Sequence, residues 1–221
     1  MSDTLAGNPY LGTNRNPFNY EKVEQITRDV SSEWLTLEEI TQQLNLFDDE
    51  SQDGYVRSVE LATRMAIEDY LGMSIFPVTY KVYYGTFNSM GGSQVSLDLP
   101  AVSIVSQNTP AITIGSIQYY NGNTPPVLMT VDPSQYFYDP TGNKIIVSGL
   151  PNDINNFISN PVIATYTCNA NPIAQYPVIK QAGLMLLTHI YNNRSNTTET
   201  KLNEIPFGVA QLLRPYKPLV M

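Results

Sequence analysis

Cysteine and histidine are almost absent from this chain of 221 residues, which has one of each, at Cys168 and His189. A single cysteine cannot form an internal disulfide, so nothing in the sequence indicates an oxidising compartment. A catalytic triad or a histidine-based metal site would depend on His189 alone, and we interpret it as a core or interface residue. Cys168 follows a predicted strand without an obvious partner base, which favours a small buried hydrophobic residue over a nucleophile.

Positive charge is also scarce. The chain has 12 Lys and Arg against 20 Asp and Glu, and its net charge is −8. A protein that grips nucleic acid needs clustered Lys and Arg, and the sequence has no such cluster. Charged residues make up only 14% of the chain, so polarity comes mainly from Asn, Thr, Ser, Gln and Tyr. This composition suits β-rich surfaces and extensive contacts with other proteins.

Long hydrophobic runs are missing as well. No stretch of about 18 apolar residues exists, so no transmembrane helix is expected. The first ten residues, MSDTLAGNPY, contain no basic stretch followed by an apolar one, so we expect no secretory signal. The length fits one domain, or one domain with an insertion, and allows a sizeable core.

Residues 1–19 are rich in Asn, Gly and Pro with little apolar periodicity, and we predict that residues 1–34 form an N-terminal arm without a fold of its own. Within this arm, Tyr20–Val30 predicts a short helix, because three apolar residues recur at helical spacing. They are Val23, Ile26 and Val30. A capping box follows at the start of the next helix, where the Thr36 hydroxyl accepts from a first-turn N–H and Glu39 reaches back.

A longer helix is predicted from Gln52 to Leu71, with Gly72 as its C-terminal stop. We place Val56, Val59, Ala62, Ala66 and Tyr70 along its packed side. Near the end of the chain, Tyr176–Arg194 predicts a central helix that is buried nearly all round, because apolar residues cover most of its circumference. A short amphipathic helix is predicted within Ile205–Tyr216.

Between the helices, the pattern changes to alternating and Tyr-rich segments that predict about six strands. These strands are Val78–Phe87, Val95–Leu99, Ile112–Tyr120, Gln135–Tyr138, Lys144–Val147 and Val162–Cys168. Two stretches predict turns: Asn121-Gly122 is a tight-turn signal, and Asp139–Asn143 predicts a hairpin between two of the strands. Strands at this spacing favour a small antiparallel sandwich or barrel.

The element order predicts an α+β fold. In it, the N-terminal two helices and the C-terminal helices form a small helical bundle, because neither end alone can bury its apolar side. An antiparallel β-sandwich or barrel is inserted between them. The predicted boundaries are 1–34 for the arm, 35–75 and 172–216 for the helical bundle, 76–171 for the inserted β domain, and 217–221 for the tail.

Several local strings, in this order, resemble the head–tail connector (adaptor) proteins of tailed bacteriophages, in particular the longer members with a β insertion. The strings cover roughly residues 35–216, and the C-terminal ones are the most specific. They are Leu35–Glu39, Glu68–Gly72, Leu99–Val105, Asp132–Tyr136, Tyr166-Thr167, Ile179–Ala182, Tyr191–Arg194, Ile205–Val209 and Leu212–Tyr216.

The resemblance implies a structural protein without enzymatic activity or cofactor. Roughly a dozen copies would form a ring below the portal protein. The ring would extend the DNA channel and dock a tail-terminator, neck or nozzle protein. DNA would pass through without specific binding, and no membrane is involved. The resemblance also implies assembly in the host cytoplasm and a final place in the virion, at the head–tail junction.

By analogy with this family, the C-terminal segment Pro206–Met221 is the expected contact with the portal. The candidate docking residues are Pro206, Phe207, Leu212, Leu213, Arg214 and Tyr216. The alternative is that the segment caps the helical core of its own subunit.

A calcium loop is a competing hypothesis, although we expect no metal. Asp49, Ser51, Asp53 and Glu60 match the ligand positions of such a loop, and Gly54 matches its turn position. These loops usually occur in pairs, and the sequence has no second copy. The alternative is that Ser51 or Asp53 caps the helix that follows.

The 15 tyrosines leave a further alternative open. Exposed aromatic residues suit a carbohydrate platform, but a sheet core and a subunit interface use them as well, and we favour the interface. The second functional hypothesis is therefore a stand-alone β-sandwich that binds glycan or protein, as in a virion accessory protein. The third is a single-loop calcium-binding protein.

Overall fold

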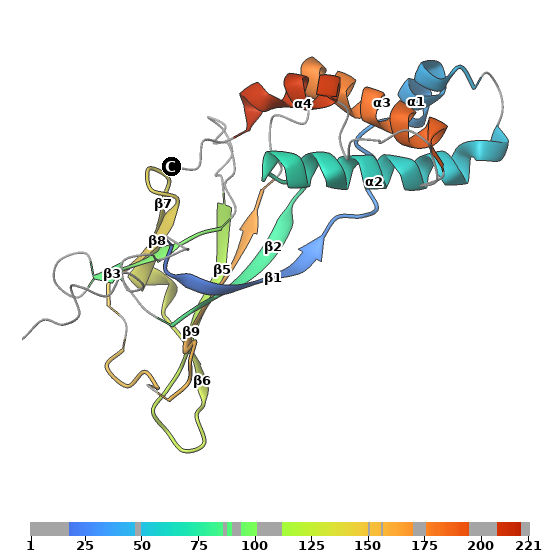
Figure 1. Ribbon diagram of the computed structural model, residues 1–221. Helices are drawn as coiled ribbons and strands as arrows, with labels where there is room; N and C mark the ends of the chain where they lie inside the picture. Colours follow the sequence, from blue (N-terminus) through green and yellow to red (C-terminus); the bar gives the residue numbers. More distant parts are fainter. Residues whose placement is uncertain are drawn as a thin grey trace, which may run out of the picture. The chain divides into compact units, whose positions relative to one another are not determined.

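The computed structural model describes residues 18–46, 50–85, 88–89, 94–100, 112–149, 151–155, 157–169, 176–194 and 207–217. Within these residues the chain forms four α-helices and two antiparallel sheets, so the predicted α+β class is confirmed (Figure 1). The helices are α1 (Leu37–Leu44), α2 (Asp53–Leu71), α3 (Pro177–Asn192) and α4 (Phe207–Leu213), with short 3-10 helices at Glu50–Gln52, Pro133–Gln135 and Arg214–Tyr216.

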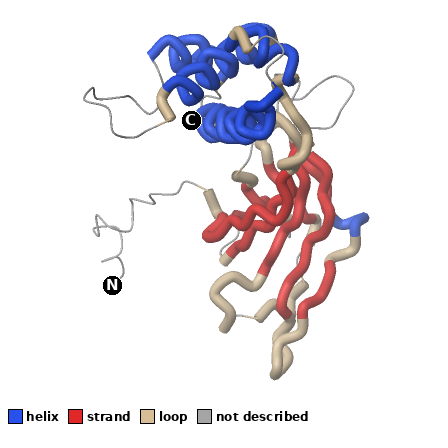
Figure 2. The backbone as a smooth tube through the Cα atoms, turned by 90° about the vertical axis from the view of Figure 1, so that its right-hand side faces the viewer, coloured by secondary structure: helices blue, strands red, loops and turns tan. Residues whose placement is uncertain are grey.

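The described strands form a five-stranded sheet in the order β1-β2-β9-β5-β6 and a four-stranded sheet in the order β3-β4-β8-β7. Figure 2 shows the strands in red and the helices in blue. Their bounds are β1 (Tyr20–Arg28), β2 (Val78–Tyr84), β3 (Asn88–Ser89), β4 (Val95–Asp98), β5 (Ile112–Tyr120), β6 (Leu128–Thr130), β7 (Tyr136–Asp139), β8 (Lys144–Val147) and β9 (Val162–Cys168).

The chain divides into two compact units. We call the first, which comprises Met1–Glu24, Lys81–Pro100 and Ile114–Thr165, the sheet unit. The second comprises Gln25–Tyr80, Ala101–Thr113 and Tyr166–Met221, and we call it the helical unit. The domain boundaries proposed from the sequence stay a prediction.

One core unites all four helices of the helical unit, as the sequence predicted for the two ends of the chain. Figure 1 shows α1, α3 and α4 along the same side of the long helix α2. The buried core residues include Ile40 of α1, Ile67 of α2, Leu186 of α3 and Val209 of α4. Burying such side chains contributes about 1.5–3 kcal/mol each, which outweighs what these short helices gain from their own propensity.

The predicted capping box at the start of α1 is confirmed. The Thr36 side chain accepts from the backbone N–H of Glu39, and the Glu39 carboxylate accepts from the backbone N–H of Thr36. The other Glu39 oxygen lies 2.6 Å from Nζ of Lys180 on α3. The hydrogen bond from Lys180, followed by that from the Thr36 backbone, lowers the pKa of Glu39. One carboxylate therefore both starts α1 and ties it to α3.

Helix α2 ends as predicted, but its packed face differs from the prediction. Gly72 takes the left-handed conformation (φ 67°), and its N–H caps the helix at the Glu68 carbonyl. Ala62, which we placed on the packed side, is exposed, whereas Arg64 is buried. The hydrophobic pattern alone misses this rotation, because three charged residues lie on the buried face.

Helix α3 buries one broad face rather than its whole circumference, so that part of the prediction is wrong for the single chain. Val178 and Met185 on its other side are each 38% exposed. On the buried face, Gly183 lies against the indole of Trp34. The small residue thus makes room for an aromatic ring from the segment before α1, not for a close helix backbone.

The predicted hairpin between β7 and β8 is confirmed. Asp139 pairs with Lys144 at its end, and the turn places Asn143 at a positive φ of 50°. By contrast, Asn121-Gly122 does not make a tight two-residue turn, because Tyr120 pairs with Leu128 across a seven-residue loop. The Asn121 side chain accepts the N–H of Val127 at 2.9 Å, which favours the longer loop.

The short helix predicted at Tyr20–Val30 is wrong, because this segment forms the edge strand β1. Its three apolar residues are all exposed, so their helical spacing did not mark a buried face. Pairing with β2 decides the conformation here, as sheet context often overrides local periodicity.

Candidate assembly surfaces

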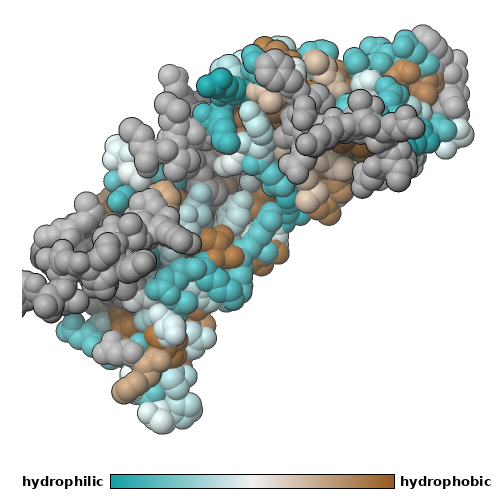
Figure 3. Space-filling view, viewed as in Figure 1, coloured by the Kyte–Doolittle hydropathy of each residue, from teal (hydrophilic) through white to brown (hydrophobic). Residues whose placement is uncertain are grey.

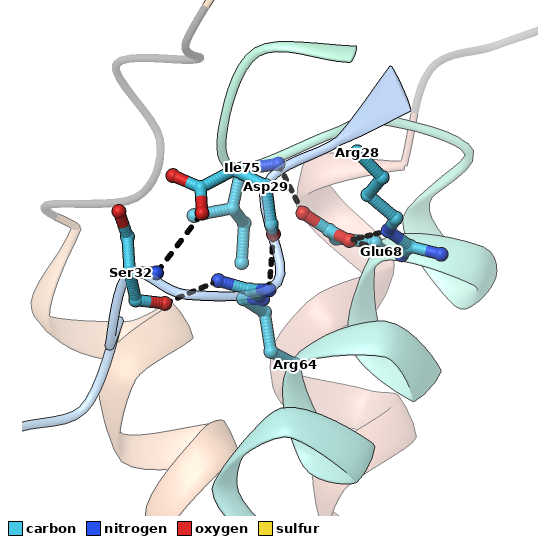
Figure 4. Close-up of polar contacts among 6 residues, drawn as sticks. All are labelled: Arg28, Asp29, Ser32, Arg64, Glu68 and Ile75. Carbon is cyan, nitrogen blue, oxygen red and sulfur yellow. Dashed lines mark hydrogen bonds and ion pairs between the residues drawn. The ribbon is translucent and has the colours of Figure 1, made fainter. Parts of the chain in front are cut away.

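A stripe of buried charge on α2 holds the segment that joins β1 to α1 (Figure 4). Glu60, Arg64 and Glu68 recur every four residues and therefore share one face of the helix. Each is at most 5% exposed, and we call these three residues the polar ladder. At its first rung, one carboxylate oxygen of Glu60 accepts from the backbone N–H groups of Trp34 and Leu35, at 3.0 and 3.3 Å.

Arg64 forms the middle rung and is fully buried. Its two terminal nitrogens donate to the carbonyl oxygens of Asp29 and Ser32, each at 2.6 Å. The Asp29 carboxylate in turn accepts from the backbone N–H groups of Ser31 and Ser32. Hydrogen bonds from Ser32 and Ser31 hold the pKa of the Asp29 carboxyl well below its usual range. Arg64 thus binds two backbone carbonyls of a tight turn, rather than one partner side chain, and so stabilises the turn.

Glu68 forms the last rung. It accepts from Arg28, the last residue of β1, and from the backbone N–H of Ile75 at 2.7 Å. The side chain of Arg28 is 16% exposed and that of Glu68 5% exposed, so solvent screens this ion pair only weakly. The ladder therefore fastens the C-terminal end of β1 to α2.

A second polar clamp lies just before β1, within the sheet unit. The backbone N–H of Asn19 donates to the Asp98 carboxylate at 3.0 Å, and its side-chain amide donates to the Ser96 carbonyl at 2.6 Å. The Asn19 side-chain oxygen accepts from the Asp98 N–H at 2.9 Å. Lys144 neutralises the same Asp98 carboxylate at 3.1 Å. The chain is therefore fixed on both sides of β1, although the strand itself is mostly exposed.

Exposed apolar side chains gather on particular elements. On the face in Figure 3, hydrophobic residues reach the surface in separate groups. Among the large apolar residues that are exposed, one group lies on or beside β1 and one on or beside β6, the two outer strands of the five-stranded sheet. A third lies on α3 and at the residue before it, and Phe157 is 99% exposed. The groups are Val23, Ile26 and Val30; Val127, Leu128 and Met129; and Tyr176, Val178 and Met185.

The predicted portal-docking residues have different surroundings. Leu213 is fully buried in the core of the helical unit, Leu212 and Tyr216 are partly buried against that core, and Arg214 is exposed. Phe207 begins α4, and Pro206 lies outside the described residues. The segment therefore packs against the core of its own chain and leaves the Arg214 side chain exposed.

The calcium hypothesis stays a prediction, because Asp49 lies outside the described residues. Asp53 and Gly54 belong to the first turn of α2, and Glu60, the proposed bidentate ligand, already accepts two backbone N–H groups. Within the described ranges, no three His, Cys, Asp or Glu side chains are grouped closely enough to hold a metal ion. In the same part of the chain, no helix combines the length and apolar character that a membrane crossing requires.

His189 and Cys168 take the places that the sequence predicted for them. His189 is partly buried in the last turn of α3, where the Asn193 side chain donates to its carbonyl at 2.7 Å. Cys168 ends β9 and is 2% exposed. Burial raises the pKa of its thiol to about 12.

The buried thiol gives a first prediction. At about pH 8 a thiol with a pKa near 12 is ionised in roughly one molecule in 10,000, whereas an ordinary thiol is ionised in about a quarter. We therefore expect the native protein to react with Ellman's reagent at least about 1,000-fold more slowly than the protein in urea, which should release one thiol per chain. Fast reaction of the native protein would show that Cys168 is accessible.

Sequence analysis missed the polar ladder and the exposed residue Phe157. Charged residues at four-residue spacing usually mark a solvated helix face, so the ladder had no recognisable signal. The segment around Phe157 did carry a sequence signal, because Asn is a residue type that forms Asx turns. In the structure, the Asn155 side-chain oxygen accepts from the Phe157 N–H at 2.9 Å.

Comparisons with known proteins give a fold but no family. No family model matches the chain, and no curated protein does either. A chain in the neck of an empty GTA particle, computed with C6 symmetry, has a TM-score of 0.62 at 17% identity. A chain in the virion of a native gene transfer agent (GTA) particle has a TM-score of 0.59 at 15% identity. A chain in the neck of a native GTA particle, computed with C12 symmetry, has a TM-score of 0.57 at 16% identity. Each alignment covers 91% of this chain and 97% of the other. This chain therefore has the fold of chains found in the neck and virion of GTA particles.

Proposed function

We propose that this chain is a head–tail connector (adaptor) of a tailed phage or a phage-like particle. In this proposal, roughly a dozen copies form a ring below the portal protein, which continues the DNA channel and docks the next neck component. The observation that carries the proposal is the fold likeness to neck chains, which spans nearly the whole of both chains. The ordered C-terminal strings that resemble the adaptor family support it independently.

The charge of the chain suits a channel through which DNA must slide. At −8 per copy, a ring of about a dozen copies carries a total charge on the order of −100. A field of this sign repels phosphate, so the ring would not retain DNA. The proposal requires no catalytic step and no cofactor.

The described structure changes how portal docking is best tested. Deleting Leu212–Met221 would remove Leu213 from the core. A truncated protein that failed to join heads could then be misfolded rather than unable to dock. We instead expect Arg214→Glu to leave the fold intact and to abolish joining to portal-bearing heads, because a reversed exposed charge at an interface is strongly unfavourable. Gln181→Glu, at an exposed position on α3, is the matched control. If the Arg214→Glu variant joins portal-bearing heads normally, Arg214 is not part of the docking surface.

The decisive test of the function is the location of the protein in the particle. A tagged copy should appear by cryo-electron microscopy as a closed ring at the head–tail junction, and particles without the protein should contain heads that have not joined tails. Its absence from the neck, or its presence on the capsid surface or a tail fibre, would overturn the proposal and favour the binding-module hypothesis.

A further inference from the structure

A closed ring of identical subunits sets a geometric requirement for the proposed connector. A head-to-tail contact joins two different surfaces of the same chain, one on each side of every subunit. The two outer strands of the five-stranded sheet, β1 and β6, form such a pair of surfaces. Unpaired strand edges expose backbone donors and acceptors, which readily pair with another chain.

Both edges carry apolar side chains that a folded monomer would normally bury or shield. On β1, Val23 is 38% and Ile26 51% exposed, and on β6, Leu128 is 39% and Met129 41% exposed. All three residues of β6 are exposed, so both faces of this strand reach solvent. Such edges are a risk for aggregation in a monomer, and a neighbouring edge in an assembly removes that risk.

Strand β1 is also unusually well fixed for an exposed strand of nine residues. The Asn19 clamp holds the chain before it, and the Glu68 rung of the polar ladder holds its last residue, Arg28. A pre-ordered edge loses little conformational entropy when a second strand joins it. The two clamps therefore favour β1 as the receiving edge.

The charges of the two edges do not oppose a contact. Strand β1 carries both signs, and its Lys22 is paired with Glu24. Residues 112–130, which include β5 and β6, contain no charged side chain. Contact between the two edges therefore adds no repulsion between like charges.

We propose that β6 of one copy lies against β1 of the next copy, so that the five-stranded sheets of neighbouring subunits continue into one another around the ring. This inference rests on the connector function proposed above, because it needs a cyclic assembly of second copies.

Cysteine cross-linking in assembled particles tests the contact. Four double variants combine Val23→Cys or Ile26→Cys with Leu128→Cys or Met129→Cys. Since adjacent side chains of a strand point to opposite faces, these pairs sample both faces of the junction. A disulfide needs Cα atoms about 4.4–6.8 Å apart, so only closely apposed strands react. The native cysteine, Cys168, is buried and gives little background.

We expect at least one double variant to lose its monomer band after mild oxidation and to form a ladder of multiples of the chain on non-reducing gels. The single-cysteine variants, and Val23→Cys combined with Gln181→Cys on α3, should stay monomeric on the same gel. Cross-linking of a single variant to itself, or of β1 or β6 to another neck protein only, would overturn the proposal.

Electron microscopy of the same particles separates the two proposals. If the ring is present in the neck and none of the four pairs cross-links, this inference fails and the connector function stands. If the protein forms no ring, both fail together.

Discussion

Replacing Arg64 with alanine is expected to lower the free energy of unfolding by about 3–5 kcal/mol, because the change leaves buried polar partners without their counterpart. Arg64 is fully buried and donates to the carbonyls of Asp29 and Ser32. It also lies between the Glu60 and Glu68 rungs on the buried face of α2. Its guanidinium packs 4.8 Å from the ring centroid of Phe76, so packing is lost together with charge.

Two variants make this test specific. Arg57→Ala removes an arginine two turns earlier on the same helix, where the ion pair with Glu33 is exposed and contributes about 0–1 kcal/mol. The loss of unfolding free energy in Arg64→Lys should lie between the losses in Arg57→Ala and Arg64→Ala, since an ammonium cannot span both carbonyls as a guanidinium does. Urea unfolding followed by circular dichroism gives all three values. If Arg64→Ala and Arg57→Ala are equally stable, the polar ladder does not hold the turn.

Much of the fold was predictable because its signals are local. The capping box at Thr36 and Glu39, the stop at Gly72 and the hairpin at Asp139–Asn143 each depend on a few neighbouring residues. Strands β5 and β9 begin and end at the predicted residues, because turn residues bound both segments. The pairing of the two ends of the chain was predictable from a general requirement, namely that an amphipathic helix needs a partner for its apolar face.

The elements that were missed depend on distant partners. Strand β1 has helical spacing of apolar residues and acquires its conformation from β2, far along the sequence. Strand β6 has only three residues, too few for any periodic pattern. Glu60 and Arg64 looked like a solvated helix face, because the groups that bury them are backbone atoms of another segment, which carry no sequence signature.

The candidate surfaces were less predictable than the fold. A family resemblance pointed to the C-terminal segment, where, of the candidate residues with described side chains, Arg214 is exposed, Leu212 and Tyr216 are partly buried and Leu213 is buried. The two sheet edges could not be found from sequence, because exposure of a strand edge follows from strand order. That order, β1-β2-β9-β5-β6, joins segments from across the chain.

Trp34 is expected to contribute about as much as Arg64 to stability. It is the single tryptophan, is 6% exposed, and belongs to the core that unites the four helices. Trp34→Ala should lower the free energy of unfolding by about 3–5 kcal/mol, through lost burial and the cavity that remains. Trp34→Phe should cost less, since most of the aromatic ring is retained. A cost below about 1 kcal/mol for Trp34→Ala would mean that the indole is not part of the core.

The contact between Trp34 and Gly183 gives a sharper test of the same packing. A Cβ at Gly183 would lie 2.7 and 2.8 Å from Cη2 and Cζ3 of the indole. Gly183→Ala should therefore cost about 1–3 kcal/mol by overpacking. Gly54→Ala, on α2 with no atom within 4 Å of the new Cβ, should be neutral or slightly stabilising.

The two substitutions should also be coupled. Cη2 and Cζ3 belong to the outer ring of the indole, which phenylalanine lacks, so the penalty for Gly183→Ala should largely disappear in a Trp34→Phe background. A double-mutant cycle measured by far-ultraviolet circular dichroism, which does not need tryptophan emission, should give a coupling energy of about 1–3 kcal/mol. Additive costs would place the strain at some neighbour of Gly183 other than the indole. Strong coupling would establish that a ring from the segment after β1 sets how closely that segment approaches α3.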